Sequence, residues 1–236
     1  MERATHAIIM AAGRGVRMSP LTDRCPKPLV SVRGRRMIDT VIEALHQNGI
    51  YEIYVVVWHL KEQFEGLRTK YPGVILVENP FADTCNNISS LYVVRDHIAD
   101  AIILDGDQII HDGSLLKPEF PQSCYCCTYT ENHTKEWLLT LDKNGTVCHC
   151  KTDGGPKGWQ LYSVSFWTLA DGRRLAEKVA YEFENGNKDI YWDNVPLLLY
   201  PDEFKLSVRP IVPGMLVELD TIAELADFDP AYQAYL

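Results

Sequence analysis

Hydrophobic positions in the first 110 residues follow two alternating periods. Short apolar runs are typical of buried strands, and they occur at residues 7–10, 53–58, 74–78 and 101–105. Between these runs, apolar residues recur at helical spacing and predict helices at residues 37–45, 61–71 and 88–97. Strands joined by helical crossovers predict an α/β fold with a doubly wound, mainly parallel sheet.

The pattern changes after residue 107. Shorter runs predict strands at residues 123–131, 137–141, 146–151, 161–167 and 204–212. The turn sequence Asp142-Lys143-Asn144-Gly145 would join two of them as a hairpin. Helices are predicted at residues 173–185 and after Thr221, whose spacing to Glu224 fits a capping box. We expect a smaller mixed or antiparallel region that lies over the parallel sheet as a lid.

Composition agrees with one globular domain. The chain has 236 residues, 46% of them hydrophobic, which is enough to bury a single core, so we expect one domain over residues 1–236. Asp and Glu number 32 against 23 Lys and Arg, the net charge is −9, and no basic block occurs. This balance argues against a nucleic-acid partner. Without a recognisable leader or membrane-spanning run, we expect a cytoplasmic protein with no membrane partner.

The spacing of the seven cysteines favours structural thiols, with a metal site as the alternative. Cys124 with Cys126, and Cys148 with Cys150, are spaced C-x-C, whereas zinc pairs usually follow C-x-x-C. The odd total also argues against a disulfide framework. We therefore expect buried structural thiols and no metal at the cysteines.

The segment MAAGRGVRMSPLTDRCPKPL, residues 10–29, follows the first predicted strand directly. Gly13 and Gly15 would let backbone amides approach phosphate oxygens closely. Arg17 can contact two oxygens of one phosphate, and Lys27 offers a point charge between two prolines. The loop fits neither a Walker motif nor a dinucleotide fingerprint. It nevertheless predicts a polyphosphate site, with a solvated surface loop as the alternative.

The same loop resembles that of the nucleotidyltransferase family of sugar-1-phosphate pyrophosphorylases, which reads G-x-G-x-R, P-L-T and P-K-P-L. The resemblance implies a Rossmann-like fold in which residues 1–110 bind a nucleoside triphosphate and residues 111–236 bind the acceptor. It assigns the phosphates to Arg17 and Lys27, which together with Asp107 would be catalytic. The base and ribose would meet the segment DTCNNISSLYVV, where Asn86 and Ser89 are further donors and helix capping is the alternative for Asn87. The nucleotide-binding residues expected are Ala11, Ala12, Gly13, Gly15, Asn87, Ser90 and Asp105.

Joining two anions requires a cation, and Mg²⁺ is the usual one. The segment ILDGDQI places Asp105 and Asp107 on one side of a strand end. The resemblance points to Asp107 as a metal ligand and to Asp220, in VELDTIAEL, as the second. Glu218 and Asp193 compete for that second role, and Asp220 could instead serve only the start of a helix.

Several aromatic residues lie near carboxylates in the second half. These are Trp137 in KEWLL, Trp167 in VSFWTL, and Asp189, Tyr191, Trp192 and Asp193 in NKDIYWDNV. Rings with nearby acids suit a quaternary ammonium ion, although core packing is the alternative for each tryptophan. Phe166 and Trp167 would point to opposite faces of a strand, and we expect Trp167 to face the ligand.

These segments are similar, in order, to the branch of the family that activates phosphocholine with CTP. The resemblance implies Mg²⁺-dependent transfer of CMP from CTP to phosphocholine, giving CDP-choline and pyrophosphate. A 2-aminoethylphosphonate or phosphoethanolamine cytidylyltransferase would keep the loop and the metal but meet a primary ammonium with more acids and fewer rings. A sugar-1-phosphate nucleotidyltransferase and a non-catalytic nucleotide-binding module are further alternatives. Arg17, Lys27 and Asp107 argue against the last.

Overall fold

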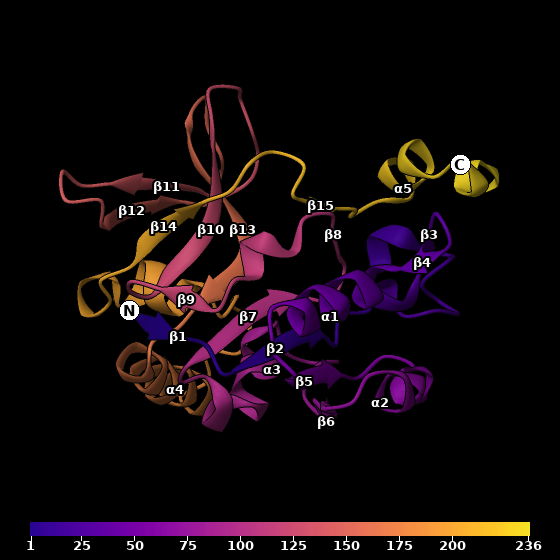
Figure 1. Cartoon of the computed structure of the whole chain (residues 1–236), viewed down its shortest axis with the longest axis horizontal. Coiled ribbons are helices and arrows are strands. Elements are labelled where there is room, and N and C mark those ends of the chain that lie inside the picture. The colour runs from indigo at the N-terminus through magenta and orange to yellow at the C-terminus, as the bar shows by residue number, and fades with distance from the viewer.

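Four parallel strands form the base of the structure, a computed structural model that describes residues 1–236. They pair in the order β7-β2-β5-β6, so β2, the first of the four in the chain, lies inside the sheet with its successors on both sides (Figure 1). This is the doubly wound parallel sheet expected from the sequence. Ligands of such sheets bind where the strand order reverses, here at the carboxyl ends of β2 and β7. The bounds are β2 His6–Ala11, β5 Glu52–Val57, β6 Val74–Glu78 and β7 Ala101–Asp105.

Helices cover both faces of this sheet. Ile9, Val55 and Leu104 belong to a core with α1 (Met37–Gln47) and α2 (Glu65–Lys70). The alternate strand residues Ile8 and Val56 belong to a second core with α3 (Ile88–Val93) and α4 (Leu169–Glu184). Period-2 alternation along each strand therefore supplies two apolar faces. The predicted helices 61–71 and 88–97 each contain a 3₁₀ turn, at Lys61–Phe64 and at Arg95–His97.

The antiparallel strands continue the parallel sheet edge to edge. β13 (Gly158–Phe166) pairs with β7 along its last residues and with β11 (Leu138–Leu141) along its first. β12 (Val147–Lys151) completes a hairpin with β11, while β10 (Cys124–Thr130) pairs with the other edge of β13 and with β14 (Ser207–Pro210). We expected this region to lie over the sheet. The β7–β13 pairing instead makes one sheet of both halves, and the far strands turn away from it (Figure 1).

Three short strand pairs complete the fold. β1 (Glu2–Arg3) pairs with β9 (Glu119–Phe120), and β3 (Ser31–Val32) pairs with β4 (Arg35–Arg36). β8 (Gln108–Ile110) pairs with β15 (Leu216–Glu218), which brings the end of the chain back to the end of β7. α5 (Ile222–Phe228) then begins with the predicted capping box between Thr221 and Glu224.

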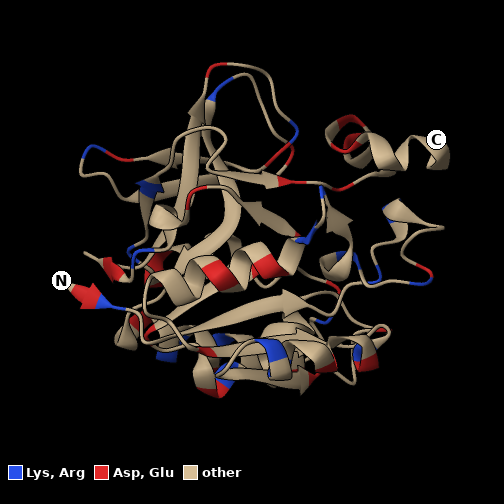
Figure 2. Cartoon of the chain, turned by 45° about the vertical axis from the view of Figure 1, so that its right-hand side comes forward, with Lys and Arg blue, Asp and Glu red and all other residues tan.

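The cysteines differ in burial, and the charged residues are mixed in sign. Cys124, Cys126, Cys127 and Cys150 are buried, Cys25 and Cys85 are half-buried, Cys148 is exposed, and none forms a disulfide. Lysine and arginine positions are scattered among acidic ones in the view of Figure 2. No helix has the length and apolar character needed to cross a bilayer.

Candidate active site

The loop after β2 folds back on itself at Gly15. The backbone there is left-handed, with φ of +65°, and a Cβ atom would lie 3.0 Å from Cβ of Lys27 and 3.1 Å from Cγ2 of Thr22. The Thr22 hydroxyl donates a hydrogen bond of 2.8 Å to the Gly15 carbonyl. Glycine is needed at this position for both its conformation and its small size. The turn therefore brings Lys27 underneath the glycine-rich segment.

Lys27 lies between two carboxylates. Its side chain is 8% exposed, and its Nζ atom lies 2.6 Å from Oδ2 of Asp107 and 2.7 Å from Oδ1 of Asp220. Arg17 pairs with the same Asp220 oxygen at 3.0 Å. Burial disfavours the Lys27 charge, but the two carboxylates outweigh it and raise the pKa of Lys27. Burial likewise opposes the charge of Asp220, yet Lys27 and Arg17 hold the pKa of that carboxyl below its usual value.

Asp107 and Asp220 could hold a divalent cation. Because both carboxylates approach one nitrogen atom within 2.7 Å, they can also converge on one metal ion. No group of three or more His, Cys, Asp and Glu side chains is arranged to bind a metal. Two carboxylates nevertheless suit Mg²⁺, which usually takes one or two from the protein and completes its shell with water and substrate phosphates. The capping alternative for Asp220 does not hold, because Thr221 caps α5 and the Asp220 side chain pairs with Lys27.

A cavity of about 420 Å³ lies above the loop. Every residue of the expected nucleotide-binding set lines it, and so does Asn86. Ser89 does not: it is fully buried, where its hydroxyl accepts from Asn79 Nδ2 and donates to the Asn86 carbonyl. Asn87 lines the cavity, and its side chain makes no capping bond to α3. Its Oδ1 atom instead accepts a hydrogen bond of 2.8 Å from the Trp192 backbone N–H. The lining includes Ala11, Ala12, Gly13, Gly15, Asn87, Ser90 and Asp105, together with Arg17 and Lys27.

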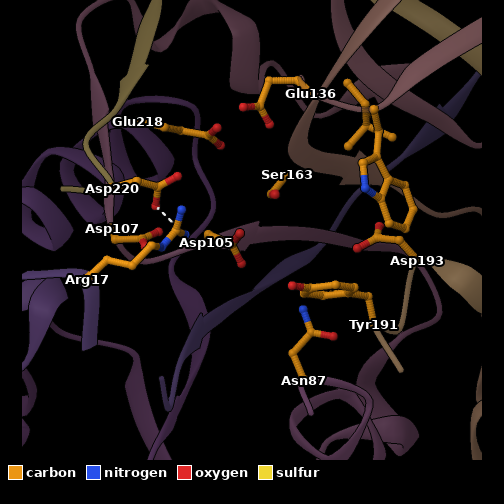
Figure 3. A pocket seen from close by; sticks show the side chains of 12 residues that line it. Arg17, Asn87, Asp105, Asp107, Glu136, Ser163, Tyr191, Asp193, Glu218 and Asp220 are labelled. Carbon is orange, nitrogen blue, oxygen red and sulfur yellow. Dashed lines mark ion pairs between the residues drawn. The ribbon is translucent and has the colours of Figure 1, made fainter. Parts of the chain in front are cut away.

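A second cavity of about 330 Å³ shares a wall with the first. Figure 3 shows Arg17, Asp107 and Asp220 on one side of it and Asp193 with Tyr191 on the other. The rings of Trp137 and Tyr191 meet edge to face with centroids 6.0 Å apart. The residues that line this second cavity are Arg17, Asn87, Asp105, Asp107, Glu136, Trp137, Leu161, Ser163, Tyr191, Asp193, Glu218 and Asp220.

Four carboxyl groups of this second cavity have no cationic partner within ion-pair distance: Asp105, Glu136, Asp193 and Glu218. Burial, together with Asp107 and Glu218, raises the pKa of Asp105 well above its usual value. Burial raises the pKa of Asp193 to about 7, and burial with Asp107 and Asp220 raises that of Glu218 to about 7. Such a site favours a positively charged ligand.

Three residues expected at the acceptor lie elsewhere. Trp167 is fully buried and donates its Nε1 proton to Ser165 Oγ, so the expectation that it faces the ligand is wrong. Trp192 is 3% exposed and packs in the same core. Asp189 is exposed and lines neither cavity. The tryptophans are buried because helices cover both faces of the sheet, which leaves neither Phe166 nor Trp167 open to a ligand.

Other cavity residues were not selected from the sequence. Glu136 precedes Trp137 within the quoted KEWLL segment, and both line the cavity from the loop before β11. Leu161 and Ser163 alternate along β13 and reach it from one face. Ser165 carries a second hydroxyl on the same face, so the alternation alone does not single out Ser163.

The chain is similar to known nucleotidyl transferases along its length. A family model described as nucleotidyl transferase matches residues 6–117. A 2-aminoethylphosphonate cytidylyltransferase from Lancefieldella rimae is 41% identical over 232 residues, covering 97% of this chain and 93% of the relative. A choline-phosphate cytidylyltransferase from Streptococcus pneumoniae is 35% identical over 222 residues, covering 92% and 94%. The solved structure of CTP:phosphocholine cytidylyltransferase from Streptococcus pneumoniae matches with a TM-score of 0.90 and 31% identity, covering 98% of this chain and 100% of that chain.

Proposed function

The chain belongs to the nucleotidyl transferase family, and we propose that it is a CTP-dependent cytidylyltransferase whose acceptor is a small phosphonate or phosphate ester with a primary ammonium group. 2-Aminoethylphosphonate is the leading candidate. An oxygen of the acceptor attacks the α-phosphorus of CTP, the bond from that phosphorus to the bridging oxygen breaks, and pyrophosphate leaves. CTP occupies the first cavity, lined mostly by residues 1–110, and the acceptor occupies the second, lined mostly by residues 111–236.

The observation that carries this proposal is the surplus of acids over rings in the second cavity. Two aromatic residues line it, Trp137 and Tyr191, against four carboxyl groups without a cationic partner. A primary ammonium has three N–H donors that carboxylates accept, whereas a trimethylammonium has none and depends on aromatic faces. The 41% identity to the 2-aminoethylphosphonate enzyme supports the same choice over the phosphocholine acceptor first expected from the sequence.

The residues around Lys27 would bind the phosphates and the metal ion. Asp107 and Asp220 would hold Mg²⁺, which neutralises phosphate charge and polarises the attacked phosphorus. Arg17 and Lys27 contribute positive charge where it develops on the phosphates and on the departing pyrophosphate. Lys27 contacts both carboxylates, so a metal ion held by Asp107 and Asp220 would compete with its ammonium and leave that ammonium available to pair with the phosphates.

Phosphocholine is the second candidate acceptor. The edge-to-face pair of Trp137 and Tyr191 offers π faces beside Asp193, which is an arrangement that can also hold a methylated ammonium. The 35% identity to a choline-phosphate enzyme supports this reading.

A pyrophosphate-release assay decides between these acceptors. It crosses CTP, UTP, ATP and GTP with 2-aminoethylphosphonate, phosphoethanolamine, phosphocholine and glucose-1-phosphate. We expect the highest kcat/KM for CTP with 2-aminoethylphosphonate, at least about tenfold above phosphocholine. A preference for phosphocholine would mean that Trp137 and Tyr191, and not the acids, determine the choice of acceptor. A preference for glucose-1-phosphate would overturn the proposal of an ammonium acceptor altogether.

A further inference from the structure

The Asp193 carboxylate accepts one hydrogen bond from another side chain, and the donor lies outside the second cavity. The hydroxyl of Tyr125, on β10, donates to Oδ1 of Asp193 at 2.9 Å. Tyr125 is fully buried and does not line the cavity, whereas Asp193 does. Neither lysine, arginine nor histidine pairs with this carboxylate. One oxygen of Asp193 is therefore fixed from behind, and the other is left for a ligand.

The Tyr125 ring is itself held in place by the tryptophans that do not reach the ligand. It stacks on Trp192 with centroids 6.1 Å apart and meets Trp167 edge to face at the same centroid distance. Trp192 directly precedes Asp193 in the chain. This packing restricts the phenol to one orientation, so its hydroxyl has a fixed place relative to the carboxylate.

The titratable groups nearest Asp193 are neutral or acidic, and Arg17, the one cation that lines the cavity, lies on its opposite side and pairs with Asp220 (Figure 3). Tyr125 faces it from β10, Asp105 from β7 and Cys150 from β12, and Glu136 lines the same cavity. Burial raises the pKa of Asp193, and the Tyr125 hydrogen bond acts in the opposite direction by stabilising the ionised form. Without the phenol, Asp193 would be protonated over a wider pH range and would bind an ammonium more weakly.

We propose that Tyr125 is a positioning residue that orients the Asp193 carboxylate toward the ammonium group of the acceptor without touching the acceptor. This proposal rests on the proposed function, because it requires the ammonium to contact Asp193. It also gives Trp167 and Trp192 a role, as the packing that holds Tyr125.

The direct test is Tyr125→Phe, which keeps the ring and removes the hydroxyl. We expect the KM for 2-aminoethylphosphonate to rise by about tenfold while the KM for CTP stays unchanged. The acidic limb of the profile of kcat/KM for the acceptor should move to higher pH. The control is Tyr129→Phe on the same strand, since that side chain is 49% exposed and contacts Trp159. Equal KM values and pH profiles in wild type and Tyr125→Phe would overturn the proposal.

Two further measurements distinguish a wrong positioning role for Tyr125 from a poorly folded variant and from a wrong acceptor site. Incorporation of 3,5-difluorotyrosine at position 125 keeps the shape and makes the hydroxyl a stronger donor, so the acidic limb should move to lower pH; an unmoved limb contradicts the proposal even if Tyr125→Phe folds poorly. Asp193→Asn tests the premise. If it leaves the acceptor KM unchanged, the proposed acceptor site is wrong, whereas a loss in Asp193→Asn with none in Tyr125→Phe overturns only the positioning role.

Discussion

At the scale of single residues, the two sides of the site differ in how their charges are paired. On the phosphate side, formed by Arg17, Lys27, Asp107 and Asp220, opposite charges pair with one another. On the acceptor side, the other carboxylates of the second cavity have no cationic partner. Lys27 and Arg17 pair with Asp107 and Asp220, but Asp193 has only a phenol as its partner. We therefore expect Lys27, Arg17, Asp107 and Asp220 to exchange these ion pairs for bonds to substrate and metal. The acceptor side is incomplete until a cation enters.

Lys27 and a metal ion should compete for the same carboxylates. In Lys27→Met, the aliphatic stem stays and the ammonium is lost, so Asp107 and Asp220 are left without their shared cation. We expect Mn²⁺ to bind about tenfold more tightly in the absence of nucleotide, while turnover falls by about 100-fold. Electron paramagnetic resonance titration measures the first effect. Lys61→Met, which removes a surface ion pair with Glu78, is the control, and equal Mn²⁺ affinity in wild type and Lys27→Met would contradict the competition.

Asp193 should destabilise the unliganded protein as pH rises. Burial raises its pKa from 3.8 to about 7, so the folded state binds a proton that the unfolded state has already lost between these values. The stability that this group contributes is present below pH 3.8 and is lost as pH rises through about 7. We expect Asp193→Asn to stabilise the protein by up to about 4 kcal/mol at pH 8, and by less than half of that at pH 5. Chemical denaturation at both pH values checks this, with the exposed Asp189→Asn as control; a gain independent of pH would contradict it.

At the scale of elements, strand pairing determines which distant residues meet. The β8–β15 pair joins Gln108 to Glu218 in register, and Gln108 Nε2 donates to Glu218 Oε1 at 2.7 Å. Asp220, two residues later, then lies beside Asp107. Three-residue strands have no periodicity that a sequence pattern can detect, so the proximity of these carboxylates rested on the family resemblance alone.

This pairing predicts different outcomes for two neighbouring acids. Asp220→Asn should abolish Mg²⁺-dependent activity, because it removes one of the two carboxylates that converge at Lys27. Glu218→Gln should retain metal dependence and raise mainly the KM of the acceptor, since Glu218 is bonded to Gln108 and lines the second cavity. Activity measured against Mg²⁺ concentration separates the two. Normal metal dependence in Asp220→Asn would transfer the ligand role to Glu218.

The packing of α4 depends on Gly172. A Cβ atom there would lie 2.5 Å from Cα of Ala99 and 2.7 Å from the Ile98 carbonyl, so Gly172→Ala should destabilise the protein by about 1–3 kcal/mol. Gly66, in α2, has open space around it, and Gly66→Ala should be neutral or stabilising by up to about 1 kcal/mol. Denaturation midpoints compare the two. Equal effects would mean that α4 can shift away from Ala99.

Much of the fold follows from hydrophobic period, and less of the site does. The runs at residues 7–10 and 101–105 predict two parallel strands, and the loop between the first strand and α1 predicts the phosphate side. Trp167 shows the limit: alternation correctly separates it from Phe166, but only tertiary packing shows that both faces are buried at the end of that strand. Glu136, Ser163 and Asp105 line one cavity because β13 pairs with both β11 and β7, and no local pattern specifies these pairings.

At the scale of the whole molecule, the two halves of one sheet each supply a cavity, and the cavities meet at shared residues. Asn87, Asp105 and Tyr191 are among those that line both. A nucleotide held by the loop after β2 and an acceptor held by the antiparallel half would therefore approach each other at Asp107 and Asp220, the proposed metal ligands. This is the geometry that transfer between two bound substrates requires.

The most direct test of this account is a competition in one reaction. Equal concentrations of 2-aminoethylphosphonate and its N,N,N-trimethyl derivative share one phosphonate and differ only at nitrogen. With CTP and Mg²⁺, the ratio of the two cytidylylated products, measured by mass spectrometry at low conversion, equals the ratio of kcat/KM values. The acid-rich cavity predicts that the unmethylated product exceeds the methylated one by at least about tenfold. A ratio of one, or an excess of the methylated product, would contradict recognition of a primary ammonium.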